Sequence, residues 1–191
     1  MVVCHELAHT VVWYSFGREI RGITFRRSID GYLSGGSANV NPSNLENNQD
    51  AEQFVERMLA GDSAARRKLG MRRDQISTVG FAVNARTSIP SLLSTANRND
   101  DAMWAIFAAY KTRKPNWLET ILIHFGKKPG WFKWLSLRLE MTNARVDAHW
   151  RAIEAISKEL IARLPADGEE TVIPADFLTG SLEREGVQLC D

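Results

Sequence analysis

The sequence has little cysteine and no long apolar run, and these absences exclude several classes of protein. Cys4 and Cys190 are the only cysteines in 191 residues, which argues against a disulfide-rich secreted scaffold and favours a reducing compartment. No apolar stretch reaches the roughly 18 residues that a membrane-spanning helix needs, and the N-terminal stretch lacks the basic region of a signal peptide. We therefore expect a soluble protein of the cytoplasm with no membrane span.

Strong net charge and a phosphate-binding loop are also missing. The formal net charge is +1, so the overall field of the protein gives no reason to expect nucleic acid as a partner. The pattern GxxxxGK[ST] does not occur, so we expect no ATP binding by this chain. Hydrophobic residues make up 44% and charged residues 25%, which is the balance of one globular domain with a substantial core.

Helical periodicity dominates what is present. Residues 2–16 are apolar on nearly every side, which is typical of a buried helix. Further helices are expected at 49–69, 100–110 and 137–164, and a short last helix is expected to begin near Pro174. The predicted fold is therefore mainly α, built around a helical bundle.

A small N-terminal sheet is expected beside these helices. The segment EIRGITFRR (19–27) has the pattern of a short strand with a kink at Gly22, and another strand is expected at Tyr32 and Leu33. Residues 70–90 are ambiguous and are interpreted as part loop and part helix. The fold class is thus α+β, with residues 1–191 forming a single domain.

The segment 111–136 is basic, aromatic and punctuated by proline, and we interpret it as an insertion or lid. Trp117, Trp131, Phe132 and Trp134 lie among lysines and arginines. This composition also suits binding to nucleic acid or to a membrane surface, through phosphate contacts and stacking. A cap packed on the core is the interpretation that we favour.

The stretch VVCHELAHTVV (2–12) contains the pattern H-E-x-x-H. Residues four apart lie on one face of a helix, so His5 and His9 can hold a single metal ion. Glu6 lies about 100° further round the helix, where it can reach a metal-bound water without being a ligand. Two imidazoles, a carboxylate and an open fourth position suit Zn²⁺, which lowers the pKa of its water toward about 7. The alternative is a hydrogen-bonded polar cluster in the core.

The third metal ligand is not fixed by the motif. The extended form of the pattern, with a glycine and a third histidine, fails because Val12 and Ser15 stand at those positions. Cys4 adjoins His5 but does not share its helix face, so we expect it to pack as a small hydrophobe. The remaining candidates for the third ligand are acidic residues and one histidine elsewhere in the chain: Glu52, Glu56, Asp100, Asp101, Asp147 and His149.

The order of these features resembles the peptidase domain of FtsH-type ATP-dependent zinc proteases. CHELAHTVV is similar to that family's HEAGHAVV, GDSAARRKLG to its Gly-Arg-Ala-Ala-Glu segment, and NDDAMWAIFAA to its Asn-Asp-Leu-Glu-Lys-Ala-Thr helix. HWRAIEAISKELIARL…IPADFL resembles the closing helices, so the resemblance extends over almost the whole chain. It implies a zincin-like helix and a zinc ion held by His5, His9 and Asp101. Asp101 is preferred because it places Ala105 and Ala109 where the family has small residues, and Asp100 is the reserve.

The resemblance implies a zinc-dependent metalloendopeptidase with Glu6 as its general base. The chain departs from the family in having Leu7 and Ala8 for Ala and Gly, and Arg66 near the position of a Glu. Since the unfolding motor is absent from the sequence, flexible or unfolded protein segments are the expected substrates. They are expected to pair with an edge strand near residues 20–25. A homo-oligomer or a separate partner protein is left open, and the alternative function is an inactive, zinc-stabilised interaction module.

Overall fold

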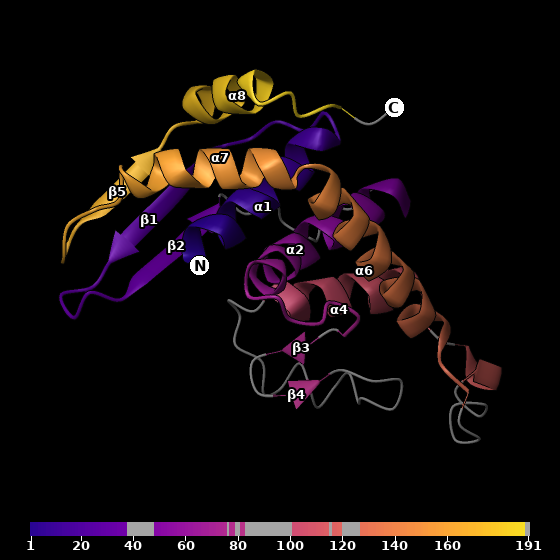
Figure 1. Cartoon of the computed structure of the whole chain (residues 1–191). Coiled ribbons are helices and arrows are strands. Elements are labelled where there is room, and N and C mark those ends of the chain that lie inside the picture. The colour runs from indigo at the N-terminus through magenta and orange to yellow at the C-terminus, as the bar shows by residue number, and fades with distance from the viewer. Residues whose placement is uncertain are drawn as a thin grey trace.

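A computed structural model of the chain describes residues 1–37, 48–75, 77–78, 81–82, 101–114, 116–119 and 127–189. The fold is mainly helical with a small antiparallel sheet, as predicted (Figure 1). Its elements, in chain order, are α1 (Val2–Ser15), β1 (Ile23–Arg27), β2 (Leu33–Ser37), α2 (Asn48–Lys68), β3 (Ser77–Thr78), β4 (Phe81–Ala82), α4 (Asp101–Thr112), α6 (Gly130–Ala148), α7 (Trp150–Ile161), β5 (Glu170–Ile173) and α8 (Ala175–Arg184).

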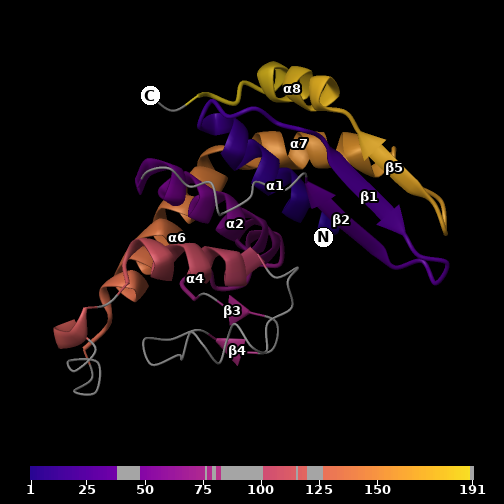
Figure 2. The ribbon, with the colours of Figure 1, turned by 180° about the vertical axis from the view of Figure 1, so that it is seen from behind.

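Helix α1 lies at the centre of the fold, as its apolar sequence predicts. Leu7, Ala8, Val11 and Val12 are completely buried, and the helix packs against both α2 and α7. Cys4 is also buried in this core, as expected for a small hydrophobe. A second apolar cluster joins α2, α4 and α6, so α2 and α6 contribute to both halves of the core (Figure 2).

The three-stranded sheet has the order β2-β1-β5, with both neighbours antiparallel to β1. Strand β5 was not predicted; it comes from far along the chain and pairs Ile173 with Ile23. The expected kink at Gly22 is present, since this residue has φ +100° and a Cβ there would lie 2.7 Å from the Ile173 carbonyl oxygen. Because β1 is the central strand, the prediction that residues 20–25 offer a free edge to substrate is wrong. Within the described residues, β2 and β5 form the edges of this sheet instead.

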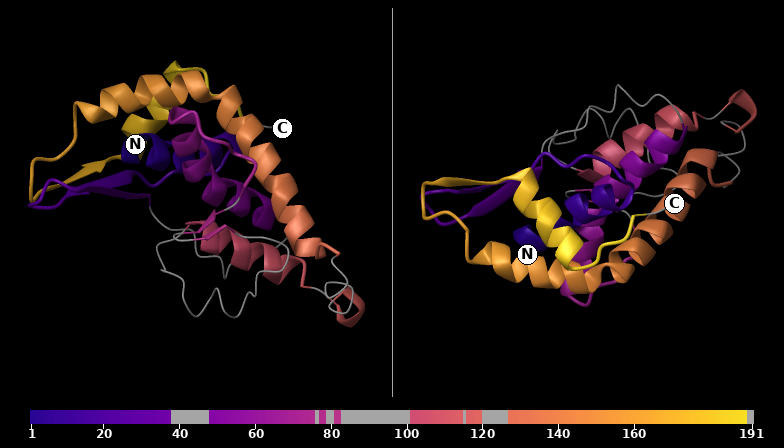
Figure 3. Two further views of the ribbon diagram at one scale, coloured as in Figure 1. Left: turned by 60° about the horizontal axis from the view of Figure 1, so that its bottom comes forward. Right: turned by 90° about the horizontal axis from the view of Figure 1, so that it is seen from above.

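The predicted helix at 137–164 is two helices that meet at an angle (Figure 3). Helix α6 begins at Gly130, after Pro129, and is separated from α7 at His149, whose φ of −104° and ψ of 12° are not helical. Trp131 is 3% exposed, within the cluster that contains α2 and α4. The predicted insertion therefore extended too far, because residues 130–136 belong to α6.

The remaining assignments concern residues 70–90 and membrane crossing. Residues 77–78 and 81–82 form the short pair β3 and β4, with Ser77 opposite Ala82, and residues 71–75 are not helical. Other residues of that segment lie outside the described ranges. No helix within the described ranges is long and apolar enough to cross a membrane.

Candidate metal centre

Helices α1 and α4 bring three potential metal ligands together. The Oδ2 atom of Asp101, the first residue of α4, lies 3.1 Å from Nε2 of His5 and 3.1 Å from Nε2 of His9. The two Nε2 atoms are themselves 3.1 Å apart. Within the part of the chain that the structure describes, no other group of three or more His, Cys, Asp or Glu side chains converges in this way.

A hydrogen bond to α2 fixes the orientation of the His9 ring. Its Nδ1 donates a hydrogen bond of 2.6 Å to the backbone carbonyl of Arg57 on α2, and the side chain is 3% exposed. In neutral imidazole one nitrogen carries the proton and the other has a free lone pair. Since Nδ1 carries the proton, the lone pair is on Nε2, directed at Asp101 and His5. This is the arrangement that a metal-binding histidine needs.

Electrostatics favour an ionised Asp101. Burial alone would raise the pKa of Asp101, but the neighbouring His9 and His5 outweigh it and hold the pKa well below its usual range. Burial likewise tends to lower the pKa of His9, yet the Asp101 carboxylate, Glu6 and the Arg57 carbonyl raise it above the usual value. The centre thus presents a permanent negative charge to two imidazoles at neutral pH, and a cation can replace the protons that this arrangement attracts.

The spacing of the three atoms matches a tetrahedral zinc site. Zinc–nitrogen and zinc–oxygen bonds of about 2.0–2.2 Å place two tetrahedral ligands about 3.3 Å apart. All three separations here are 3.1 Å. The side chains of His5 and Asp101 are 29% and 34% exposed, so solvent reaches one side of the centre. The residues present therefore fit three ligands of a zinc ion, and no fourth side chain from the described residues joins them.

Gly61 on α2 gives these imidazoles the space that they occupy. A Cβ at this position would lie 2.5 Å from Nε2 of His9 and 2.6 Å from Nε2 of His5. Glycine inside a helix is less favourable than alanine by roughly 1 kcal/mol, so its presence here calls for a local reason. This role was not predicted from the sequence, although a lone glycine in the 49–69 helical pattern was a usable signal.

Glu6 lies beside the centre and against strand β2. It is 9% exposed, and a Cβ on Gly35 would lie 2.5 Å from its Cγ atom, so the strand passes directly over the Glu6 side chain. Among the described residues, none forms a hydrogen bond with its carboxylate. Glu6 is thus held by packing, one helical position from His5, with its carboxylate available for a further partner.

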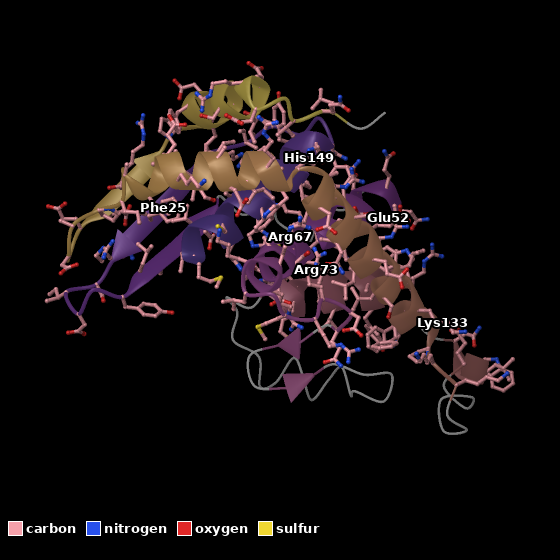
Figure 4. All side chains as sticks on the ribbon, viewed as in Figure 1. Phe25, Glu52, Arg67, Arg73, Lys133 and His149 are labelled. Carbon is pink, nitrogen blue, oxygen red and sulfur yellow. The ribbon has the colours of Figure 1, made fainter. Side chains whose placement is uncertain are left out.

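Two other candidate ligands, Glu52 and Glu56, face α6 and not the centre. Glu56 is 2% exposed and accepts hydrogen bonds from Arg138 at 3.1 Å and Arg145 at 3.2 Å. Glu52, labelled in Figure 4, accepts one from Arg138 at 3.0 Å. These carboxylates join α2 to α6 by ion pairs, and so they have a structural role.

Removal of the buried Glu56 carboxylate should destabilise the fold. We expect Glu56→Ala to lower the free energy of unfolding by about 3–5 kcal/mol, because it removes a 2% exposed carboxylate that pairs with two half-buried arginines, Arg138 and Arg145. The matched control is Glu52→Ala, since this side chain is 31% exposed and one hydrogen bond is lost; its cost should stay near or below about 1 kcal/mol. Urea denaturation of both variants measures the difference, and similar costs would contradict the structural role of Glu56.

Asp147 and His149 do not join the centre either. Asp147 pairs with Arg67 and Arg73, which Figure 4 labels beneath α6, and so it is ion-paired and not simply solvated. His149 lies at the junction of α6 and α7, where burial and Arg145 lower its pKa. Asp100, the reserve for Asp101, lies outside the described residues.

The chain was compared with known protein families and curated proteins. Comparison with models of protein families and with curated proteins found no match for the chain. The resemblance to FtsH-type peptidase domains therefore stays a prediction that depends on the quoted motifs. The case for a metal centre is supported by the distances, burial and charges of His5, His9 and Asp101.

Proposed function

We propose that the chain is a zinc-dependent metalloendopeptidase in which His5, His9 and Asp101 hold the metal. The observation that carries this proposal is the convergence of one ligand atom from each residue within 4.8 Å, with Glu6 next to them on α1. The donor set of two imidazoles and a carboxylate is one that catalytic zinc sites use. The FtsH-like order of motifs supports the same ligands from the sequence side.

The chemistry divides between the metal and Glu6. A zinc ion bound at this centre supplies a Lewis acid and lowers the pKa of a water molecule to near 7. The Glu6 carboxylate accepts the proton of the attacking water and then returns it to the amine that leaves when the peptide bond breaks. Its position against Gly35 keeps it close to the backbone of β2.

Strand β2 is the proposed docking edge for the substrate. One side of β2 pairs with β1, and no strand within the described residues pairs with the other side. Gly35 and Gly36 remove side chains from its middle, so an extended peptide can approach the backbone closely. Backbone pairing of this kind requires an extended segment, so we propose flexible or unfolded protein segments as substrates. A cytoplasmic location is part of the proposal, and it agrees with Cys4 being a free thiol.

Metal content and cleavage test the proposal together. The purified chain should contain about one zinc per molecule, since the centre offers one set of three ligands. It should degrade casein, lose that activity with a chelator, and regain it when zinc is restored. A chain purified without chelator that contains only traces of zinc would refute the metal centre. Stoichiometric zinc with no cleavage of casein would favour the inactive interaction module.

Substitution of the third ligand should weaken the metal centre. We expect Asp101→Asn to lower zinc affinity by at least about 100-fold, because it removes the negative charge at the position where all three donors meet. Competition with a coloured chelator measures this affinity. Asp176→Asn is the matched control, since Asp176 also lies in the first turn of a helix, α8; unchanged zinc binding there and in Asp101→Asn would rule out Asp101 as a ligand.

A further inference from the structure

The end of the α4–α6 pair furthest from the sheet carries a surface that the metal centre does not use. We call the described residues 111–114, 116–119, 127, 128 and 133 the tip surface. It lies where α4 ends and α6 begins, and it projects away from the rest of the molecule (Figure 3). Lys133, labelled in Figure 4, marks its position on α6.

Positive charge is concentrated at the tip surface. Its six cations are all exposed: Lys111, Arg113, Lys114, Lys127, Lys128 and Lys133. The segment 111–133 contains these six cations and one acid, so it carries +5, while the rest of the chain carries −4 because the total is +1. The near-neutral total charge therefore conceals a strong asymmetry, and a negatively charged partner would meet this end of the molecule first.

Two apolar side chains stand exposed among these cations. Trp117 is 75% exposed and Leu118 is 49% exposed. They belong to a turn that is closed by reciprocal hydrogen bonds, in which the Glu119 amide donates to Asn116 Oδ1 at 2.8 Å and the Asn116 amide donates to Glu119 Oε2 at 3.3 Å. Glu119 also rests against Gly130, where a Cβ would lie 3.1 Å from its Oε1 atom. The turn thus holds Trp117 and Leu118 outward.

We propose that the tip surface binds the surface of an anionic lipid bilayer. Tryptophan favours the boundary between headgroups and acyl chains, and lysine and arginine are attracted to anionic headgroups. Stable attachment at a bilayer surface needs an apolar signal together with a basic one, and the tip surface has both. Trp117 and Leu118 enter the headgroup region, while the surrounding cations contact lipid phosphates.

A bilayer suits this surface better than a nucleic acid. Binding of single strands uses several aromatic rings along a basic groove, on which successive bases stack. Among the described residues of this region, Trp117 is the one exposed aromatic side chain, because Trp131 is buried and Phe132 and Trp134 pack partly buried against the core; its neighbour Leu118 is aliphatic. An aromatic and an aliphatic side chain together at a projecting end are suited to partition into an apolar layer.

Co-sedimentation of the full chain with vesicles tests this inference. We expect binding to vesicles of phosphatidylcholine with phosphatidylglycerol, no binding to phosphatidylcholine alone, and weaker binding as salt rises. The double variant Lys127→Glu/Lys128→Glu should weaken binding by about 30-fold or more, the combined effect of two lost cations. Trp117→Ala should weaken it by about tenfold, in line with the loss of a large apolar side chain.

A matched control separates the tip surface from the overall charge. Arg151→Glu/Lys158→Glu makes the same change of charge at two exposed positions on α7, and it should leave vesicle binding unchanged. Equal loss in both double variants, equal binding to neutral vesicles, or binding to oligonucleotides without binding to vesicles would overturn the inference. The experiment measures no cleavage, so its outcome is independent of the proposed peptidase activity.

Discussion

A Gly61→Ala chain should fold but lose the metal centre. The added Cβ would lie 2.5 Å from Nε2 of His9 and 2.6 Å from Nε2 of His5, distances that require something to move. His9 cannot move without breaking its hydrogen bond to the Arg57 carbonyl, and it is 3% exposed in a closely packed region. We therefore expect zinc affinity to fall by at least about 100-fold, because the ligand atoms no longer meet with a bonding geometry.

Helix propensity favours the Gly61→Ala change, so a loss of zinc would not come from a weakened α2. Alanine is favoured over glycine inside a helix by roughly 1 kcal/mol, so α2 itself is not weakened by the change. Gly180→Ala on α8 is the control, since a Cβ there would meet nothing within 4 Å. It should retain zinc and gain a little stability.

Zinc content after purification, circular dichroism and thermal unfolding distinguish the possible outcomes. Helical signal with little zinc in Gly61→Ala, beside normal zinc in Gly180→Ala, is the expected pair of results. If Gly61→Ala binds zinc as tightly as the parent chain, the close approach of α2 does not shape the centre.

The pairing of His5 with His9 was predictable because it is local. Helical geometry places residues four apart on one face, and the apolar sequence of residues 2–16 made burial of that helix predictable as well. The structure shows both the helix and the convergence of the two Nε2 atoms. The α+β class followed from the same periodicity, since it depends on patterns within single elements.

The third residue of the centre was harder, because contact between Asp101 and α1 is made across more than ninety residues. Spacing alone left Glu52, Glu56 and several other residues open, and the preference for Asp101 came from the family resemblance. What excludes Glu52 and Glu56 is their pairing with arginines of α6, which is a consequence of tertiary packing. Local residue spacing cannot predict that tertiary packing.

The sheet shows the same limit. Residues 170–173 form an edge strand in which Val172 is 60% exposed, and they pair with β1 from more than 140 residues away. Their short and mostly exposed sequence has no strong strand pattern, so β5 was missed and β1 was taken for an edge. The functions of Gly35 and Gly61 were missed for a related reason, since a glycine shows where space is needed but not which side chain needs it.

A Glu6→Gln chain should bind zinc normally and lose peptidase activity. Glutamine has nearly the shape of glutamate, so the packing of this 9% exposed side chain against Gly35 is preserved. It cannot take a proton from the attacking water, because its amide is not a base. The three converging ligand atoms do not include Glu6, so zinc affinity should stay within about twofold of the parent chain while casein cleavage falls by about 10²–10⁴-fold.

Asp101→Asn is the variant to compare with Glu6→Gln, because it separates the loss of a metal ligand from the loss of the general base. Both variants exchange a carboxylate for an amide near the same imidazoles, but the loss of zinc is expected for Asp101→Asn alone. Loss of zinc in Glu6→Gln would make Glu6 a ligand, and cleavage equal to that of the parent would disprove its role as the base. If Glu6→Gln binds zinc as tightly as the parent chain but does not cleave casein, Glu6 carries out the proton transfer. The metal ligands and the fold are then the same in Glu6→Gln and in the parent chain.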